Sequence, residues 1–452
     1  MSLSARLRQD DLLSRVLLNS AHLFSSNSIS LVLSFAQGIL AARLLGLGDY
    51  GLVVIVMAYA STVNGLFSFR MSELVVRYAG EYLETAEKEK AAALIKAAAL
   101  AEAGVSALAF IVVAATAGIA TRLITKAQGS EWMIMLFSLG LLANFNTETS
   151  TGILQITGKV RMRGVVNLAQ TILSLSIIGA AFILNRGTAA LGSRTVLIVL
   201  VGYLAGKSLL GLGLFTSAQV ELRRVLGRGW SRASLRVLPS GRELVRFAFS
   251  SNLSATAILI FRESEILWIG FFLSREAAAL FKNAYTIVLF LAVPADPLIL
   301  AVYPELNRLI VLKAWPRLRA FLRSVTLISL GYNTLLALGL VLFGRLILSV
   351  YGSQYVAAYP ALIVLLAGFA FNFTLFWNRP LLLSLGLPTF PLWAILIAGV
   401  LKVSMGFLLV PRYGYTMEAA LLSMYYVISV GLMVWRGLSE IRRQDAESTG
   451  QA

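Results

Sequence analysis

Residues 324–350 read SVTLISLGYNTLLALGLVLFGRLILSV, an apolar run in which Arg345 is the one charged residue. This run exceeds the roughly 20 residues that an α-helix needs to cross the hydrocarbon core of a bilayer. The preceding stretch, KAWPRLRAFLR at residues 313–323, is basic and contains no acidic residue. A transmembrane helix with a basic flank is predicted here.

The same pattern recurs along the whole chain. The mean hydropathy is +0.80, and 58% hydrophobic residues against 13% charged ones exclude an ordinary soluble domain. The apolar runs do not alternate with period two, so a closed β-barrel is excluded. About twelve spans are predicted, at residues 20–43, 50–72, 91–117, 133–154, 164–185, 194–218, 247–273, 280–303, 324–350, 359–379, 390–411 and 416–436.

Positive charge is distributed unevenly between these spans. Most of the 39 Lys and Arg residues lie in the two tails and in every second gap. By the positive-inside rule, both termini are predicted to be cytoplasmic, in a multi-pass protein of the cytoplasmic (inner) membrane. The net charge of +17 is explained by attraction to an anionic inner leaflet, with no need for a nucleic-acid partner.

The composition also limits the chemistry. The chain has no Cys and one His, His22, so disulfides, thiol catalysis and thiolate metal sites are excluded. There is no cluster of metal ligands and no sign of a cofactor. The outer loops are short and carry few acids, which argues against an enzyme active site outside the membrane.

The longest hydrophilic interruption divides the spans into two sets of six. Residues 1–218 are predicted to form an N-terminal lobe, 219–246 a basic cytoplasmic linker, 247–436 a C-terminal lobe and 437–452 a cytoplasmic tail. Short matches, Ser26-Asn27 with Ser251-Asn252 and Ala58-Tyr59 with Ala284-Tyr285, suggest an internal repeat. Because each half has an even number of spans, the lobes would be related by a pseudo-twofold axis along the membrane normal, with a central cavity between them.

Five loop motifs carry a resemblance to a known family. They come in the order ARLLG with DYG after the first span, ELVVRYAGEY after the second, YPEL after the eighth, YGSQY before the tenth and VPRYG before the twelfth, at residues 42–51, 73–82, 303–306, 351–355 and 410–414. With this order the chain resembles the polysaccharide flippases of the multidrug/oligosaccharidyl-lipid/polysaccharide exporter superfamily. The family pattern continues the last motif with small residues, whereas this chain has Thr416-Met417-Glu418.

The resemblance implies a flippase that moves a polyprenyl-diphosphate-linked oligosaccharide to the outer leaflet by alternating access, for assembly of a surface polysaccharide such as exopolysaccharide or O-antigen. It implies membrane lipids as surroundings, a polysaccharide polymerase and chain-length machinery as partners, and a monomeric transporter. The nearest alternative is a multidrug exporter of the same superfamily coupled to H⁺ or Na⁺. A membrane-embedded polysaccharide polymerase or ligase is a weaker alternative.

Apart from Arg345 and the four arginines at the first or last residue of a span (Arg43, Arg194, Arg379 and Arg436), six basic residues fall inside the spans. Arg70, Lys96 and Lys282 lie near span ends, where their long side chains can reach an interface. Lys207, Arg262 and Lys402 lie near the middles of spans, where a charge costs several kcal/mol unless it has a partner or a wet cavity. We therefore predict that these three bind the diphosphate head group.

Acidic residues at similar depth leave two interpretations open. Glu265 follows Arg262 by three residues, so the two can form a structural ion pair on one helix face. Alternatively, Glu263, Glu265 and Asp296 carry a coupling proton or cation and pair with bases when the site empties; Asp296, between two prolines, can also just satisfy a helix kink. In the first lobe, Gln37 is the neutral counterpart of Arg262.

Overall fold

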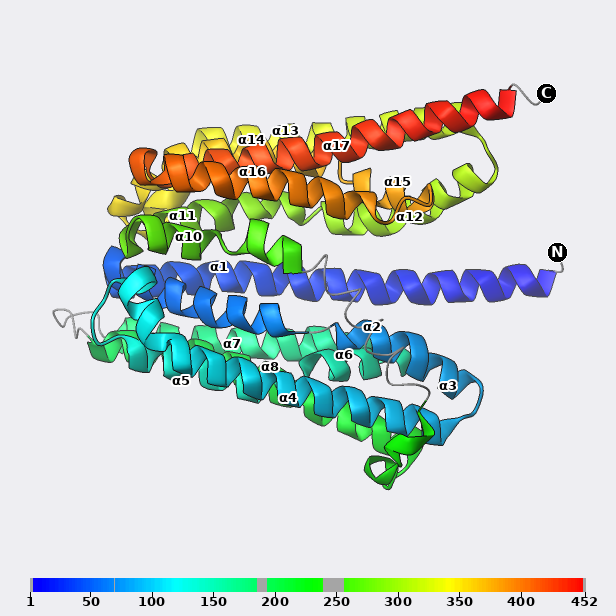
Figure 1. The fold of residues 1–452 in the computed structure, drawn as a ribbon, viewed down its shortest axis with the longest axis horizontal. Helices are drawn as coiled ribbons and strands as arrows, with labels where there is room; N and C mark the ends of the chain where they lie inside the picture. The colour runs from blue at the N-terminus through cyan, green and yellow to red at the C-terminus, as the bar shows by residue number, and fades with distance from the viewer. Residues whose placement is uncertain (1–2, 69, 185–192, 239–255, 450–452) are drawn as a thin grey trace. The chain divides into compact units, whose positions relative to one another are not determined.

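A computed structural model describes residues 3–68, 70–184, 193–238 and 256–449, and every regular element in these ranges is a helix (Figure 1). Within them, eight helices are long and apolar enough to cross a membrane. The sequence predicts about twelve spans, and the difference has a structural cause. One of the eight, Ile29–Glu84, covers the first two predicted spans, while the fourth, seventh and eighth are broken into shorter helices. The chain is thus an all-helical, multi-span membrane protein.

The chain forms two compact units. Unit 1 contains the described residues within 1–45, 56–122 and 127–256, and unit 2 those within 46–55, 123–126 and 257–452. Two short segments from the first half of the sequence therefore belong to the second unit. Each unit is described by itself below.

Unit 1 has a core of long helices interrupted near its polar residues. Its helices α4 and α5 are neighbours, and α8 packs against α7 and α6. Gly206 makes the α7–α8 contact close, because a Cβ there would collide with Ser174. The elements are α1 (Leu3–Phe67, which bends at Gly46), α2 (Met71–Leu74), η1 (Val75–Ala79), α3 (Gly80–Glu84), α4 (Lys88–Ala120), η2 (Thr121–Thr125), α5 (Glu131–Ala143), α6 (Thr147–Ile156), α7 (Val160–Leu184), α8 (Ser193–Leu226), η3 (Trp230–Arg232) and η4 (Leu235–Val237).

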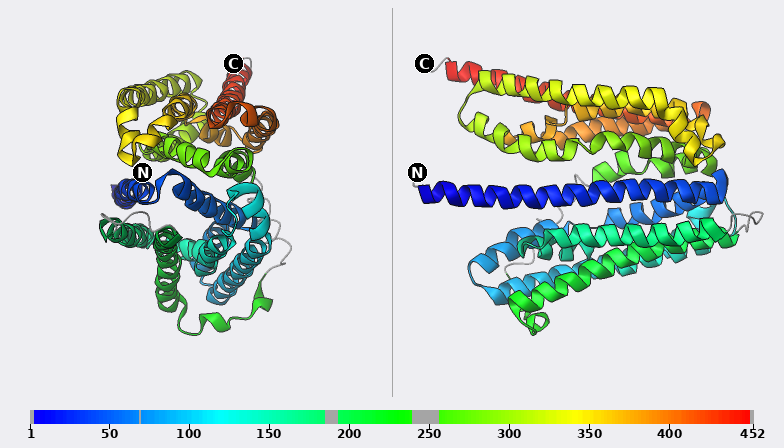
Figure 2. Two further views of the ribbon diagram at one scale, coloured as in Figure 1. Left: turned by 90° about the vertical axis from the view of Figure 1, so that its left-hand side faces the viewer. Right: turned by 180° about the vertical axis from the view of Figure 1, so that it is seen from behind.

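Unit 2 contains four long helices, α13, α14, α16 and α17, whose neighbours are α13–α14, α14–α17 and α16–α17 (Figure 2). Leu306, Trp315, Leu318, Leu381 and Ile441 form part of its core. The elements are η5 (Leu259–Glu263), α10 (Glu265–Phe272), α11 (Arg275–Val288), η6 (Leu289–Ala292), α12 (Ala295–Val311), α13 (Trp315–Tyr351), η7 (Ser353–Ala358), α14 (Tyr359–Thr374), α15 (Asn378–Ser384), α16 (Phe390–Tyr413) and α17 (Tyr415–Thr449).

The segment 46–55 is bound tightly within unit 2. The Tyr50 hydroxyl donates to Asn283 Oδ1 at 3.2 Å, and the Tyr355 hydroxyl donates to the Gly46 carbonyl at 3.3 Å. Gly51 lies against the backbone of Arg275, so closely that a Cβ would overlap the Arg275 carbonyl. Two of the loop motifs, DYG and YGSQY, thus meet each other in space.

Turns of the same kind recur at a nearly constant spacing in the two halves. Positive φ angles of similar size occur in pairs 227 residues apart (86 and 313) and 228 apart (158 and 386). Backbone hydrogen bonds match as well: the N–H of Glu87 donates to the carbonyl of Tyr82, and that of Ala314 to the carbonyl of Leu309. The sequence match at residues 251–252 lies outside the described residues, but these turns provide independent support for a repeat.

Candidate functional site

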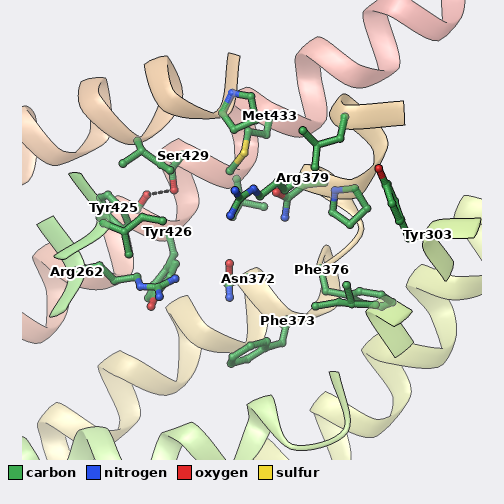
Figure 3. Close-up of a pocket in the computed structure, with 18 of the residues that line it drawn as sticks. Arg262, Tyr303, Asn372, Phe373, Phe376, Arg379, Tyr425, Tyr426, Ser429 and Met433 are labelled. Carbon is green, nitrogen blue, oxygen red and sulfur yellow. Dashed lines mark hydrogen bonds between the residues drawn. The ribbon is translucent and has the colours of Figure 1, made fainter. Parts of the chain in front are cut away.

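A cavity of about 700 Å³ lies wholly within unit 2. In Figure 3, Arg262, Tyr425 and Tyr426 lie toward one end and Tyr303 and Phe376 toward the other, with Asn372 and Arg379 between. Two arginines and several aromatic rings therefore face one space. The lining residues are Ile258, Arg262, Ile299, Tyr303, Pro304, Asn372, Phe373, Phe376, Asn378, Arg379, Pro380, Leu383, Pro391, Ile395, Tyr425, Tyr426, Ser429, Val430 and Met433.

Arg262 reaches this cavity from a break in the seventh predicted span. The chain forms a π-helical turn, η5, that ends at Glu263, and α10 begins at Glu265 after Ser264. Irregular backbone at membrane depth is tolerated where it lines a cavity or is buried in protein. Arg262 Nη2 lies 3.0 Å from Glu263 Oε1, and both side chains are partly exposed. The ion pair considered from the sequence, Arg262 with Glu265, is replaced by this neighbouring pair.

Glu265 pairs instead with Lys402, within a buried cluster. The Lys402 ammonium contacts Glu265 Oε1 and lies 3.0 Å from Glu418 Oε1. It also donates to the Phe261 carbonyl at 3.4 Å. The three charged side chains are only 1–3% exposed. A lysine at this depth is thereby satisfied by two carboxylates and by a carbonyl of the broken turn.

Arg379 comes from a second break, in the tenth predicted span. Helix α14 ends at Thr374 and α15 begins at Asn378. Polar side chains of α13 stabilise the break: Ser329 Oγ donates to the Thr374 carbonyl at 2.8 Å, and Trp377 Nε1 donates to Thr326 Oγ1 at 2.8 Å. These two hydrogen bonds hold the backbone at the break, and so they set the position of Arg379 at the start of α15.

The third predicted base, Lys207, lies in unit 1 beside a much smaller polar cavity of about 150 Å³. Its ammonium donates to Ser61 Oγ at 3.4 Å and lies 5.4 Å from the centre of the Phe137 ring. Glu102 and Glu148 line the same cavity. Lys207 therefore belongs to unit 1, whereas Arg262 and Lys402 belong to unit 2.

The acids of this smaller cavity have structural partners. The Glu102 carboxylate accepts the backbone N–H groups of Glu148 and Thr149, each at 2.8 Å. These are first-turn N–H groups of α6, which have no partner within the helix. Ser72 Oγ donates to Glu148 Oε2 at 2.5 Å. Glu102 thus caps α6 from a neighbouring helix.

Two further residues predicted from the sequence, Gln37 and Asp296, add little to the description of the site. Gln37 is buried in α1 with 5% of its surface exposed. Asp296 belongs to the backbone of α12, but its side chain lies outside the described part of the structure.

Sequence reasoning missed Arg379 and Glu418 as site residues. In the sequence, Arg379 is the last residue of the tenth predicted span, where a basic residue is expected on the cytoplasmic side. Glu418 looked like a departure from a loop motif, yet it is one of the two carboxylates on Lys402. Glu418 lies seven residues before Tyr425, so in a helix the two side chains share one face. This spacing was the signal available in the sequence.

Comparison with known proteins decides the family. The family described as "Polysaccharide biosynthesis protein" matches residues 16–310. The chain belongs to this family. The family is one of transporters in the multidrug/oligosaccharidyl-lipid/polysaccharide exporter superfamily, which confirms the resemblance found in the loop motifs.

A curated relative and two solved structures resemble this polysaccharide biosynthesis family member. Inner membrane protein YghQ of Escherichia coli (strain K12) is 26% identical over 353 residues, covering 76% of this chain and 94% of the relative. A multidrug resistance MATE family transporter in an inward-facing conformation has a TM-score of 0.70 at 15% identity, covering 92% of this chain and 95% of that one. The lipid II flippase MurJ has a TM-score of 0.69 at 13% identity, covering 94% and 90%. These two structures establish the fold.

Proposed function

We propose that this chain is a flippase that translocates polyprenyl-diphosphate-linked oligosaccharide repeat units across the cytoplasmic membrane by alternating access, for surface polysaccharide biosynthesis. The observation that carries the proposal is the unit 2 cavity. It presents Arg262 and Arg379, and no Asp or Glu occurs among the described residues that line it. Arginine is the side chain best suited to planar, two-point recognition of phosphate oxygens.

The rest of the lining suits a sugar attached to a phosphate. The tyrosines Tyr303, Tyr425 and Tyr426 provide flat apolar faces with a polar hydroxyl, and Phe376 provides a wholly apolar face. Asn372 provides an amide donor and acceptor. A cavity of about 700 Å³ is in the range of ligand sites for small molecules. It matches a diphosphate and its first sugars better than a whole repeat unit with its lipid tail, which would extend beyond it.

The topology is part of the same proposal. Twelve spans in two six-helix lobes, with both termini in the cytoplasm, are supported by the uneven basic charge and by the recurring turns 227 and 228 residues apart. In unit 1, Lys207 at its own smaller cavity would be a further contact for the anionic head group.

Complementation tests the proposal. Arg262→Ala, expressed at the wild-type level in a flippase-deficient strain, is expected to abolish polysaccharide export. Arg412→Ala is the matched control, because Arg412 is an exposed arginine at the end of α16 outside the cavity lining. Normal export by Arg262→Ala would contradict the proposal.

A multidrug exporter coupled to H⁺ or Na⁺ is the second candidate, favoured by the acids Glu263 and Glu265 beside Arg262. Drug-resistance assays in a sensitised host distinguish the two. Resistance that depends on Arg262, with no transport of lipid-linked oligosaccharide in proteoliposomes, would favour the exporter.

A further inference from the structure

We propose that Lys402 is a positioning residue for Arg262: the buried cluster Glu265–Lys402–Glu418 holds the broken turn that aims Arg262 into the cavity. This inference rests on the proposed function for its ligand, but its structural part can be tested without one. The sequence predicts that Lys402 contacts the head group, whereas in this inference Lys402 positions Arg262.

The contacts of Lys402 lie on both sides of Arg262 in the chain. Its ammonium contacts the Phe261 carbonyl just before Arg262 and the Glu265 carboxylate three residues after it. The regular helical hydrogen-bond ladder is interrupted at this point, between η5 and α10. A side chain that binds both ends of the interruption fixes the direction of the residues between them.

The face of α16 that carries Lys402 is shaped for this contact. Gly399, one turn earlier, lies against the Phe261 ring so closely that a Cβ would overlap it. Helix α16 therefore meets the broken turn at two points, an apolar contact at Gly399 and a polar one at Lys402. Both points restrain Phe261, the residue that precedes Arg262.

Glu418 extends the cluster to a third helix. Its carboxylate lies 3.0 Å from the Lys402 ammonium, and it stands at the start of α17. Tyr425 and Tyr426, which line the cavity with Arg262, follow about two turns later on the same helix. The cluster thus connects the turn that carries Arg262 to α17, the helix that supplies Tyr425 and Tyr426 to the cavity lining.

The geometry disfavours direct contact between Lys402 and a head group. Lys402 is 1% exposed and does not line the cavity, whereas Arg262 does. A phosphate would have to displace two carboxylates to reach the ammonium. The three N–H donors of the ammonium already have acceptors in Glu265, Glu418 and the Phe261 carbonyl, so the cluster leaves no spare donor for a ligand.

The test uses a neutral version of the cluster, Glu265→Gln/Lys402→Met/Glu418→Gln, in the purified full-length chain. Neutralising all three side chains together leaves no uncompensated buried charge, which is the main cost of removing one partner alone. The probe is farnesyl diphosphate, and binding is compared for the wild type, the neutral cluster, Arg262→Ala and the combination of all four changes. Glu418→Gln alone is the second variant, in case the neutral cluster does not fold.

We expect the neutral cluster to weaken farnesyl diphosphate binding about tenfold, and Arg262→Ala by at least as much. Because the cluster acts through Arg262, the combined variant is expected to be within about twofold of Arg262→Ala. For Glu418→Gln we expect a weakening of about threefold that disappears in the Arg262→Ala background. Additive losses, or unchanged binding by these variants, would overturn the inference.

A second measurement needs no ligand. The natural chain has no Cys, so Arg262→Cys introduces a single thiol whose rate of reaction with a negatively charged thiosulfonate reports its access to the cavity. The rate is expected to change about threefold or more when the cluster is neutralised, while a control thiol at Asn372→Cys keeps its rate. Equal rates at position 262 would refute positioning. If the wild type does not bind farnesyl diphosphate, the proposed function fails and the thiol rates still decide this inference.

Discussion

The breaks between α5 and α6 and between α14 and α15 each interrupt the fourth predicted span of their half of the chain, but their surroundings differ in charge and size. In unit 1 the break is held by a carboxylate, Glu102, beside a cavity of about 150 Å³. In unit 2 it is held by the neutral groups Thr326 and Ser329, and Arg379 faces a cavity of about 700 Å³. A helix break thus adjoins a small cavity lined by two acids and Lys207 in unit 1, and a larger cavity lined by two arginines in unit 2.

The largest expected effect comes from removing the base at the unit 2 break. Arg379→Ala should weaken farnesyl diphosphate binding by about 10- to 100-fold, because a hydrogen bond to a charged group contributes about 1.5–3 kcal/mol. Titration of the purified chain measures this. Thr151→Ala is the matched control, since Thr151 stands 228 residues earlier, at the spacing of the nearest turns (158 and 386). If Thr151→Ala weakened farnesyl diphosphate binding as much as Arg379→Ala, the two breaks would not differ in function.

A smaller effect, on stability and not on binding, is expected at the unit 1 break. Glu102→Ala leaves two first-turn N–H groups of α6 without their acceptor, at a cost of about 1–3 kcal/mol. The melting temperature in detergent should fall, while farnesyl diphosphate binding stays within about twofold of the wild type. Glu84→Ala, at an exposed glutamate, is the control. A tenfold loss of binding in Glu102→Ala would show that the unit 1 break takes part in recognition.

The smallest effect is expected from a neutral support of the unit 2 break. Thr326→Val removes the hydroxyl that accepts the Trp377 indole N–H, and a neutral hydrogen bond contributes about 1 kcal/mol. We expect a modest fall in melting temperature, measured beside Thr326→Ser, which keeps the hydroxyl. If the serine variant is destabilised as much as the valine variant, then the methyl packing of Thr326 and not its hydrogen bond supports the break.

The length of the apolar runs and the distribution of basic residues predicted a multi-span helical protein, because both patterns extend over whole helices. The breaks within the helices have weaker signals in the sequence. Asn144 and Asn146 are typical turn residues, but Leu375, Phe376 and Trp377 continue an apolar run without Gly or Pro. Hydropathy therefore could not show that the tenth span is interrupted there.

The candidate site was predictable only in part, for a similar reason. Arg262 and Lys402 were singled out by their depth, and they lie in one unit, close together through Phe261 and Glu265. Their partners depend on a π-helical turn, which shifts the helix register so that spacing by three residues no longer predicts contact. Lys207 shared their depth but belongs to the other unit.

The contact of residues 46–55 with α11 and η7 has a consequence for how the chain can be divided. Unit 2 is not a continuous piece of the gene, because Gly46, Tyr50 and Gly51 complete it from the first half of the sequence. A fragment that starts in the linker would lack the partner of Asn283 and the residue packed on Arg275. Chimeras of two relatives joined at the linker would therefore pair one protein's DYG loop with the other's α11, and a separately expressed C-terminal half would stay incomplete until the N-terminal half supplied that loop.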